Sequence, residues 1–327
     1  MMNENIRKTL DTDVFVTVGL CVKNAEKTIK DCIESIVNQN YPKRLMTVIV
    51  VDGKSKDKTV EMAKKQLLSS GILSKFYSDD GAGLGHARQI VLNNTNNKYV
   101  VWVDSDVIIS KDFVINQVAF MEENLKVGVA AGKSVFQLDA SFTLPASLQN
   151  LSKYVGSVEF KQTKKYRGLP PNDASIYRVE AAKQVGGFDE KIKGASEDED
   201  IMLRMRGKQW LISVNKEASF HAFPRDTWQS LWIENFWFGY GSHFLHHKHR
   251  NLRRRKKFIH RVLKLIPMIY LISGIRDSLR AYKLTLKKSS FLFPIYYFFQ
   301  STAWWFGFIR AHMENYGHAA LEFDVQT

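Results

Sequence analysis

Short β-rich runs alternate with helical patterns through the first third of the 327-residue chain. The runs at 14–22, 46–51 and 99–103 are rich in Val, which is typical of buried strands. Between the first two runs, Ile29, Cys32, Ile33, Ile36 and Val37 recur with the spacing of one helix face. This alternation predicts an α/β fold with a mostly parallel sheet that helices cover on both faces. Ligands bind such sheets beyond the carboxyl ends of the strands.

The alternation of strands and helices continues beyond these runs, although the pattern is weaker. Helices are expected at about 60–67, 84–92, 179–185 and 198–206, and strands at 75–77 and 127–136. Residues 127–228 are less regular than the first third, and they contain no internal repeat and no low-complexity linker. We therefore expect one large α/β domain followed by a different kind of module.

Two carboxylates separated by one residue, Asp104 and Asp106, follow the strand expected at 99–103. Hard oxygen ligands on one turn suit Mg²⁺ or Mn²⁺, which takes one or two protein carboxylates together with phosphate oxygens of a substrate. The structural alternative is a strand end with two solvated acids, because this short pattern also occurs by chance. We predict a divalent metal site that neutralises charge on a diphosphate leaving group.

A run of four acids, Glu197-Asp198-Glu199-Asp200, begins another expected helix. Adjacent carboxylates repel one another unless a helix N-terminus or a cation stabilises them. Ser196 and Glu199 have the spacing of a capping box, which is the structural alternative and explains one or two of the acids. A carboxylate here would also suit a general base that acts on an incoming hydroxyl.

With these two acidic sites, the chain from about 14 to 241 resembles the family 2 inverting glycosyltransferases, which have the GT-A fold. The segment VIVVDGKSKDKT is similar to the family's second motif and places the nucleobase contact on Asp52. The segment GLGHARQIVLNN places an arginine near the nucleotide at Arg88. The resemblance makes Asp106 the stronger metal ligand and sets Asp104 closer to the ribose. It implies a UDP- or GDP-linked sugar donor.

The acceptor half of the family resembles ASIYRVEAAKQVGGFDE followed by SEDEDIMLRMRGKQW. This resemblance puts the catalytic base on Asp198, with Glu197 and Asp200 as further members of the acidic motif. It also makes His221 a contact to the metal or the diphosphate. The QxxRW signature of processive synthases is missing, which favours transfer of one sugar.

The sequence departs from the family pattern at two places and leaves the acceptor open. Cys21 stands where the family commonly has proline, and Gln89 replaces the usual asparagine. An intact Glu-Asp motif favours a hydroxyl acceptor, although a phosphate acceptor, as in polyprenyl-phosphate sugar synthases, stays an alternative. A sugar nucleotidyltransferase is a further alternative, but CVKNAEKT is not the glycine-rich phosphate loop of that class.

Two other polar patterns are interpreted as structural. The acid pair Asp79-Asp80 precedes Gly81-Ala82-Gly83 and is typical of a turn. The histidines at 243, 246, 247 and 249 have no neighbouring acids or cysteines, so we assign them to a basic interfacial face and not to a metal site.

Basic residues concentrate near the C-terminus. Fourteen Lys and Arg lie between Lys248 and Lys288, opposed only by Asp277, so that this stretch carries +13 of the net charge of +14. We predict a catalytic domain at 1–247 and a basic, aromatic-rich helical module at 248–327. Because the aromatics form apolar blocks and match no nucleic-acid fold, we do not expect nucleic acid as a partner.

Two apolar segments, 262–275 and 291–309, accompany these charges. The first is too short to span a bilayer, whereas the second is near the minimum length but dominated by aromatics, which prefer the interface. We predict helices that lie on an anionic membrane surface. A single span of 291–309 is one alternative, and a soluble core or an oligomer contact is another. The polar start of the chain lacks the apolar stretch of a secretory signal, and Cys21 and Cys32 suggest free thiols. We expect the cytoplasmic face of the cell membrane and a lipid-linked or membrane-proximal acceptor.

Overall fold

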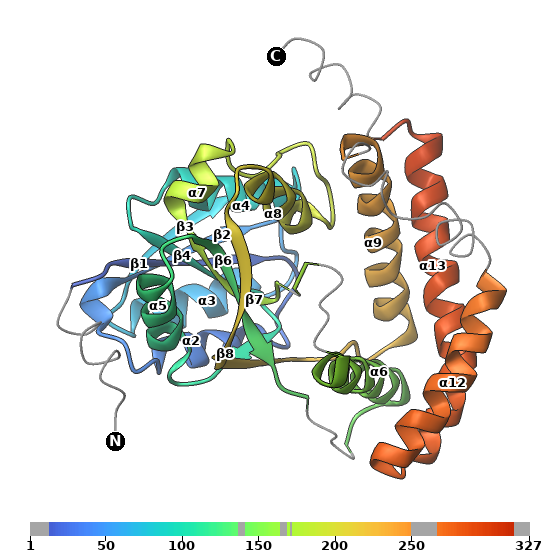
Figure 1. Ribbon diagram of the computed structural model, residues 1–327. Coiled ribbons are helices and arrows are strands. Elements are labelled where there is room, and N and C mark those ends of the chain that lie inside the picture. Colours follow the sequence, from blue (N-terminus) through green and yellow to red (C-terminus); the bar gives the residue numbers. More distant parts are fainter. Residues whose placement is uncertain (1–12, 137–140, 164–168, 171, 250–266, 317–327) are drawn as a thin grey trace. The chain divides into compact units, whose positions relative to one another are not determined.

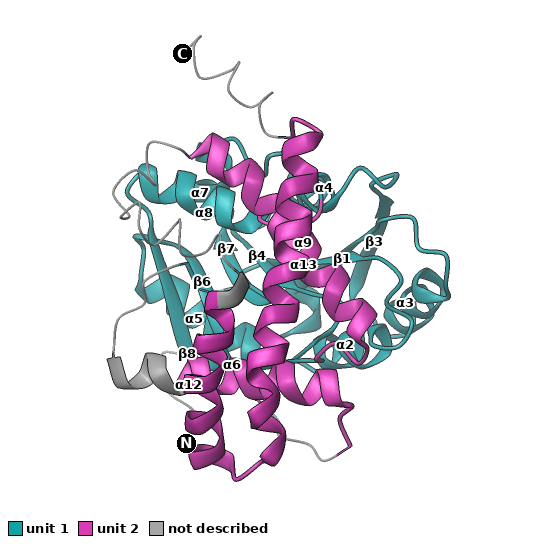
Figure 2. Cartoon of the chain, turned by 90° about the vertical axis from the view of Figure 1, so that its right-hand side faces the viewer, with its two compact units in different colours: residues 1–135, 167–193, 197–223 teal, residues 136–166, 194–196, 224–327 magenta. Residues whose placement is uncertain are grey.

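The computed structural model describes residues 13–136, 141–163, 169–170, 172–249 and 267–316. The chain forms two compact units, which Figure 2 shows in different colours. Unit 1 comprises residues 1–135, 167–193 and 197–223, and unit 2 comprises 136–166, 194–196 and 224–327. These units interleave along the chain, so they divide it at other positions than the boundary predicted at 247, which stays a prediction.

Unit 1 contains an eight-stranded sheet in the order β3-β2-β1-β4-β7-β6-β8-β5 (Figure 1). Its strands are β1 Val16–Val22, β2 Met46–Asp52, β3 Leu73–Ser78, β4 Tyr99–Val103, β5 Val107–Ile109, β6 Val127–Ser134, β7 Ala174–Arg178 and β8 Leu211–Ala222. The α/β fold predicted from the sequence is confirmed, and the strands expected in the first third of the chain all form.

The pairing is parallel in one half of the sheet and mixed in the other. Strands β3, β2, β1 and β4 pair in parallel, as predicted. Strand β7 then runs antiparallel to both β4 and β6, β8 is parallel to β6, and β5 is antiparallel to β8. The chain leaves unit 1 after β6 and returns in the opposite direction at β7, which is why the mostly parallel pattern does not continue.

Helices cover both faces of this sheet, as predicted. They are α2 Ile29–Val37, η1 Lys43–Leu45, α3 Thr59–Leu68, α4 Leu84–Asn93, α5 Phe113–Glu123, α7 Val179–Gln184 and α8 Glu197–Gly207. Helices α2, α3 and α5 contribute to one buried apolar cluster, and α4, α7 and α8 contribute to a second one. The two clusters lie on opposite faces because neighbouring residues of a strand point to opposite sides.

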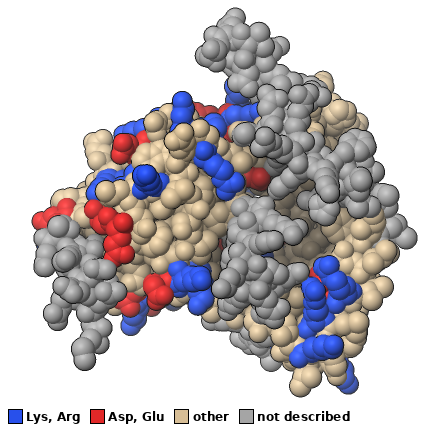
Figure 3. Space-filling model, viewed as in Figure 1, with Lys and Arg blue, Asp and Glu red and all other residues tan. Residues whose placement is uncertain are grey.

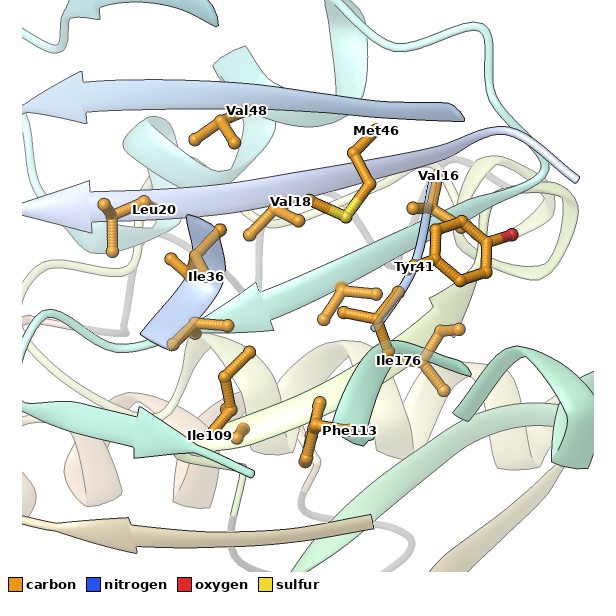
Figure 4. Close-up of a cluster of buried hydrophobic side chains, with 14 of the residues drawn as sticks. Val16, Val18, Leu20, Ile36, Tyr41, Met46, Val48, Ile109, Phe113 and Ile176 are labelled. Atoms are coloured by element: carbon orange, nitrogen blue, oxygen red, sulfur yellow. The ribbon is translucent and has the colours of Figure 1, made fainter. Parts of the chain in front are cut away.

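The first cluster is the larger core of unit 1. Figure 4 shows Val18 and Leu20 of β1 facing Ile36 of α2, with Phe113 of α5 on the same side of the sheet. Each of these four side chains is fully buried. Burying a side chain of this size contributes roughly 1.5–3 kcal/mol, so the sheet is held by apolar packing on this face. The charged side chains of the candidate site lie at the carboxyl edge of the sheet and on its other face.

Unit 2 is helical. It contains α6 Leu144–Thr163, α9 Trp228–Lys248, α12 Pro267–Thr285, η2 Lys288–Leu292 and α13 Phe293–Met313. Glycines let these helices approach each other closely: a Cβ on Gly239 of α9 would lie 1.8 Å from the carbonyl oxygen of Trp304 in α13. A Cβ on Gly307 of α13 would likewise lie 1.9 Å from the carbonyl oxygen of Phe236 in α9. The α9–α13 pair therefore depends on two glycines that a larger residue cannot replace without moving a backbone.

The histidines predicted on a basic interfacial face lie differently. His243 is only 1% exposed, and its Nε2 lies 3.2 Å from Nε2 of His247 and 3.3 Å from Nδ1 of His312. The prediction is wrong for His243, because the packing of α13 against α9 covers that side of the helix, and it is also wrong for His249, which is 7% exposed. The sequence pattern did not contain this information, since His312 lies 69 residues away.

The C-terminal segments fall only partly within the described residues. Most of the basic run, at 250–264, lies outside them, as does the start of the apolar segment 262–275. The segment 291–309 includes the last two residues of η2 and most of α13. Among the helices that the structure describes, none combines the length and apolar character that crossing a membrane requires.

We predict that Gly19→Ala destabilises unit 1 by about 1–3 kcal/mol. A Cβ on Gly19 in β1 would lie 2.6 Å from the ring of Trp102, which is itself only 2% exposed and has no room to move. Chaotrope unfolding of the variant should show an earlier midpoint than that of the unchanged protein.

Gly207→Ala is the matched control in the same unit, because a Cβ there meets no atom within 4 Å. It should leave stability unchanged or raise it by about 0.5 kcal/mol. Equal midpoints for the two variants would contradict the proposed packing of Gly19 against Trp102.

Candidate active site

The turn after β4 carries the predicted metal ligands. All five residues of β4 are buried, and the chain emerges at Asp104. The Asp104 backbone N–H donates to the carbonyl oxygen of Asp173 at 3.0 Å, and the Val107 N–H donates to that of Asp104 at 3.0 Å. The carbonyl oxygen of Asp106 accepts from the Phe223 N–H at 2.8 Å, just beyond β8. These three backbone hydrogen bonds therefore hold the main chain of the turn that carries both carboxylates.

Arg88 lies behind this turn on α4 and is 3% exposed. Its Nη2 is 3.1 Å from Oδ1 of Asp104, and its Nε is 3.3 Å from Oε1 of Glu197. Its guanidinium also stacks over Trp102, 5.2 Å from the ring centre. One buried cation thus holds together two acidic motifs that lie 93 residues apart in the sequence.

The carboxylates around Arg88 have shifted pKa values. Burial raises the pKa of Glu197 to about 7, with Arg88 opposing the shift and Asp198 adding to it. Burial among neighbouring protein atoms also raises the pKa of Asp104 well above its usual range; Arg88 opposes this, and Asp173 and Asp106 strengthen it. Such clustering of negative charge creates a place where a cation is electrostatically favoured.

The four acids at the start of α8 have different surroundings. Glu197 faces Arg88, whereas Asp200 is fully buried and accepts from Nη2 of Arg204 at 2.6 Å. Asp198 is half-buried, and its Oδ1 accepts from the Glu199 backbone N–H at 2.7 Å. Asp200 therefore has a structural role in an ion pair within α8, and Asp198 is the acid of this run that combines solvent access with closeness to Glu197.

His221 lies near the end of β8, paired with Ile108 of β5. The hydrogen bond from Phe223 to Asp106 joins this part of β8 to the turn after β4. Partial burial lowers the pKa of His221, so the neutral imidazole, which is the form that binds metals, is favoured. The predicted closeness of His221 to the turn is thus consistent with the backbone arrangement.

The fit of a divalent cation can be judged from these donors. Among the described residues, no three His, Cys, Asp or Glu side chains come together in a group that would hold a metal by itself. Mg²⁺ and Mn²⁺ usually bind one or two carboxylates and complete their shell with substrate phosphate oxygens and water. Asp104 and Asp106 fit such a site, in which the diphosphate supplies the missing ligands.

Asp52 ends β2, two strands away from β4 along the same carboxyl edge. Both oxygens of its carboxylate lie 3.2 Å from the Ser55 backbone nitrogen, whose N–H they accept. Asp79, in contrast, is buried and accepts from the N–H groups of Gly81 and Gly83, so the turn predicted there is confirmed. The structure brings Arg88, Asp104 and Glu197 into contact. Asp52 lies at the same carboxyl edge of the sheet, with β1 between its strand and β4.

Strand β7 contributes residues to which sequence reasoning assigned no role. Asp173 precedes it and provides the carbonyl oxygen that holds Asp104. Tyr177 is 1% exposed, and burial and the charge of Asp198 raise its pKa. The alternating segment ASIYR, preceded by Asn172-Asp173, has the pattern of a strand after a turn and was the signal available for this element.

A family model matches this chain. The model of glycosyl transferase family 2 matches residues 17–186, which is more than half of the chain. The chain belongs to glycosyl transferase family 2. The matched range includes Asp52, Arg88, Asp104 and Asp106, and it ends before Glu197 and Asp198.

Two curated relatives of this glycosyl transferase family 2 chain are larger proteins. The chain is 25% identical over 209 residues to the poly(ribitol-phosphate) beta-N-acetylglucosaminyltransferase TarS of Staphylococcus aureus, covering 62% of the chain and 34% of TarS. It is 38% identical over 103 residues to the glycosyltransferase GlyA of Streptococcus pneumoniae, covering 31% of the chain and 14% of GlyA. The chain therefore spans about a third or less of these relatives.

Solved structures of similar fold cover nearly the whole chain. The mannosyltransferase PcManGT from Pyrobaculum calidifontis, in complex with GDP-Man and Mn²⁺, superposes with a TM-score of 0.63 at 16% identity, covering 94% of this chain and 93% of PcManGT. TarS residues 1–349 in complex with UDP superpose with a TM-score of 0.51 at 19% identity, covering 93% and 92% of the two chains. The predicted GT-A fold is confirmed, and helices follow it at the C-terminus.

We predict that Glu197→Gln changes the pH dependence of stability. The pKa of Glu197 is about 7 in the folded protein against an ordinary value of 4.5. The folded state therefore binds this proton more tightly, so the stabilisation is complete below pH 4.5 and is lost as the pH rises through about 7. The free energy of unfolding of the unchanged protein minus that of the variant should fall across this window.

The measurement is chaotrope unfolding at a series of pH values between these limits. Glu61→Gln on the exposed side of α3 is the control, and its curve should run parallel to that of the unchanged protein. Parallel curves for Glu197→Gln as well would contradict the raised pKa.

Proposed function

We propose that this protein is a metal-dependent inverting glycosyltransferase that moves one sugar from a nucleoside-diphosphate sugar to a hydroxyl group. The observation that carries the proposal is the buried Arg88, which joins Asp104 of the metal-binding turn to Glu197 beside Asp198. A site with carboxylates for a cation on one side and a carboxylate for a proton on the other has the parts that displacement at a sugar carbon needs.

The donor would lie along the carboxyl edge of β2, β1 and β4. Asp52 at the end of β2 would contact the nucleobase, and Asp104 at the end of β4 would lie near the ribose and diphosphate; the position of both residues at one edge of the sheet supports this assignment. Arg88 is oriented mainly toward protein carboxylates, so its role toward the nucleotide is to hold Asp104 in place. UDP and GDP are both supported as the nucleotide, since TarS binds UDP and PcManGT binds GDP-Man.

Asp104 and Asp106 would hold Mg²⁺ or Mn²⁺, with His221 near the same turn. PcManGT contains Mn²⁺, which supports this assignment. When bound, the cation would neutralise the negative charge that develops on the departing nucleoside diphosphate.

The protein's own residues would perform the remaining chemistry in one step. The acceptor hydroxyl oxygen attacks the anomeric carbon from the side opposite the diphosphate, so that the carbon–oxygen bond to the diphosphate breaks as the new bond forms. Asp198 accepts the hydroxyl proton. Glu197, held by Arg88 at 3.3 Å, fixes the start of α8 and thereby the position of Asp198. The product has the inverted anomeric configuration.

A hydroxyl acceptor is favoured by the half-buried Asp198, because an ionised phosphate needs no base. A polyprenyl-phosphate acceptor stays the second candidate. We also propose that the acceptor is lipid-linked or membrane-proximal and that the enzyme works at the cytoplasmic face of the cell membrane, which the surface of unit 2 described below supports.

We predict that nucleotide binding depends on the metal and on Asp106. Calorimetric titration with UDP and with GDP, each with and without Mn²⁺, should show metal-dependent binding of one nucleotide. Asp106→Asn should weaken the metal-dependent binding by roughly tenfold or more, since a metal ligand is lost.

Asp112→Asn is the matched control, because Asp112 precedes α5 and its carboxylate accepts from Asn40. It should bind the nucleotide as the unchanged protein does. Absence of binding to both nucleotides under every metal condition would contradict the donor assignment.

We predict that Asp198→Asn lowers kcat by roughly 10²–10⁴-fold while leaving nucleotide affinity unchanged, because it removes the general base and no donor contact. Turnover is measured as release of free nucleoside diphosphate with a hydroxyl acceptor. Release of pyrophosphate would indicate nucleotidyl transfer instead, and full activity of the variant with a polyprenyl phosphate would indicate the phosphate acceptor.

A further inference from the structure

Helix α13 presents an apolar stripe to its surroundings. Large side chains at five positions of the helix are strongly exposed: Ile295 64%, Phe298 38%, Phe306 58%, Ile309 50% and Met313 75%. Together with the half-buried Thr302, they follow each other at intervals of three or four residues. That spacing places them on one side of the helix.

The exposed side of α13 is more apolar than that of a helix that faces water. The other side of α13 carries Gln300, Ser301 and Trp304, which line a cavity of about 330 Å³ together with Asn235 of α9 and Tyr270 of α12. In a water-facing helix the polar side points outward and the apolar side packs inward. An apolar patch of this extent on the outside marks a surface that another apolar medium covers.

Helix α12 adds a second apolar stripe with a cationic border. Ile272, Ile275 and Leu279 are 68%, 57% and 55% exposed and lie on one side of the helix. Arg276 and Arg280 lie along the edge of this stripe, and their side chains are 58% and 45% exposed although both pair with Asp277.

Further cations and an exposed aromatic continue this surface. Lys283 and Lys288 are also exposed, and Figure 3 shows Lys and Arg side chains gathered in this region of the molecule. Phe291 in η2, 51% exposed, lies between the two helices in the chain.

We propose that α12, η2 and α13 form a docking surface for an anionic lipid bilayer. The apolar stripes would enter the boundary between headgroups and acyl chains, and the bordering Arg and Lys would contact lipid phosphates. Helices of this kind lie in the plane of the interface, with long basic side chains extended toward the headgroups.

The charge pattern favours a bilayer over a second copy of the chain. In a two-fold contact between copies, the same patch meets itself, so the cations bordering α12 would face like charges. An anionic bilayer instead offers opposite charge beside an apolar layer, which matches both parts of the surface. This inference concerns unit 2 alone and does not depend on the proposed chemistry of unit 1.

The test is flotation of the full chain with vesicles of phosphatidylcholine alone and of phosphatidylcholine with phosphatidylglycerol. The unchanged protein should float with the anionic vesicles. The triple variant I295Q/F306Q/I309Q should bind the anionic vesicles at least roughly tenfold more weakly, since it removes three inserted side chains. The variant R280Q/K283Q/K288Q should lose the part of the binding that added salt weakens.

A matched control places the same substitution in unit 1, as L68Q/L125Q/L211Q, where the side chains are 72%, 66% and 56% exposed. This control should bind as the unchanged protein does. Circular dichroism checks that each variant is folded, and Met313→Gln, at a 75% exposed position, provides a milder change should the triple variant not fold.

The proposal would be overturned if the unchanged protein does not float. It would also be overturned if I295Q/F306Q/I309Q and Met313→Gln both float as well as the unchanged protein. Self-association in solution that I295Q/F306Q/I309Q abolishes, without vesicle binding, would overturn it in favour of a contact between copies. Because nucleotide titration is a separate measurement, a negative flotation result leaves the proposed transfer activity standing.

Discussion

The buried guanidinium of Arg88 is the interaction on which the arrangement of unit 1 depends. A cation that is 3% exposed requires compensation, because removing a charge from water costs several kcal/mol unless partners replace the water. Asp104 and Glu197 provide this compensation, and the ring of Trp102 stacks against the guanidinium. The same contacts fix the turn after β4 relative to the start of α8. Loss of either carboxylate would leave the cation underpaired, so the geometry of the site and the stability of the fold are coupled.

The mixed sheet explains how one edge receives both halves of the site. The parallel half presents the ends of β2 and β4, with Asp52 and Asp104. Strand β7 then pairs antiparallel with β4, so its beginning, preceded by Asp173, lies beside the end of β4. Residues from the second half of the chain therefore meet the turn after β4, where a wholly parallel sheet would bring only further strand ends. The antiparallel β7 thereby brings Asp173 to the turn that carries Asp104.

The helices of unit 2 pack closely at glycine positions. Its helices approach through Gly239, Gly307 and Gly274, at which a Cβ would overlap the backbone of the neighbouring helix. Such close approach fixes the rotation of α13, and this rotation leaves Ile295, Phe306 and Ile309 exposed. The buried His243 and the cavity beside Trp304 lie on the inner side. The outward apolar stripe is thus a consequence of how the backbones pack, and it gives the proposed lipid contact its geometric basis.

The sequence by itself determined the local elements and the chemistry available. Apolar periodicity sufficed for β1, β2, β4, α2 and α8 because spacing along the chain records which face is buried. The acids at 104–106 and 197–200 indicated a cation site and a base, since clustered carboxylates repel one another unless a cation or a helix N-terminus stabilises them. The tertiary structure alone decided which acids face which partner: Glu197 meets Arg88, whereas Asp200 meets Arg204. It also decided the direction of β7 and the burial of His243. These features rest on contacts between residues tens of positions apart, and no local pattern in the sequence encodes such distances.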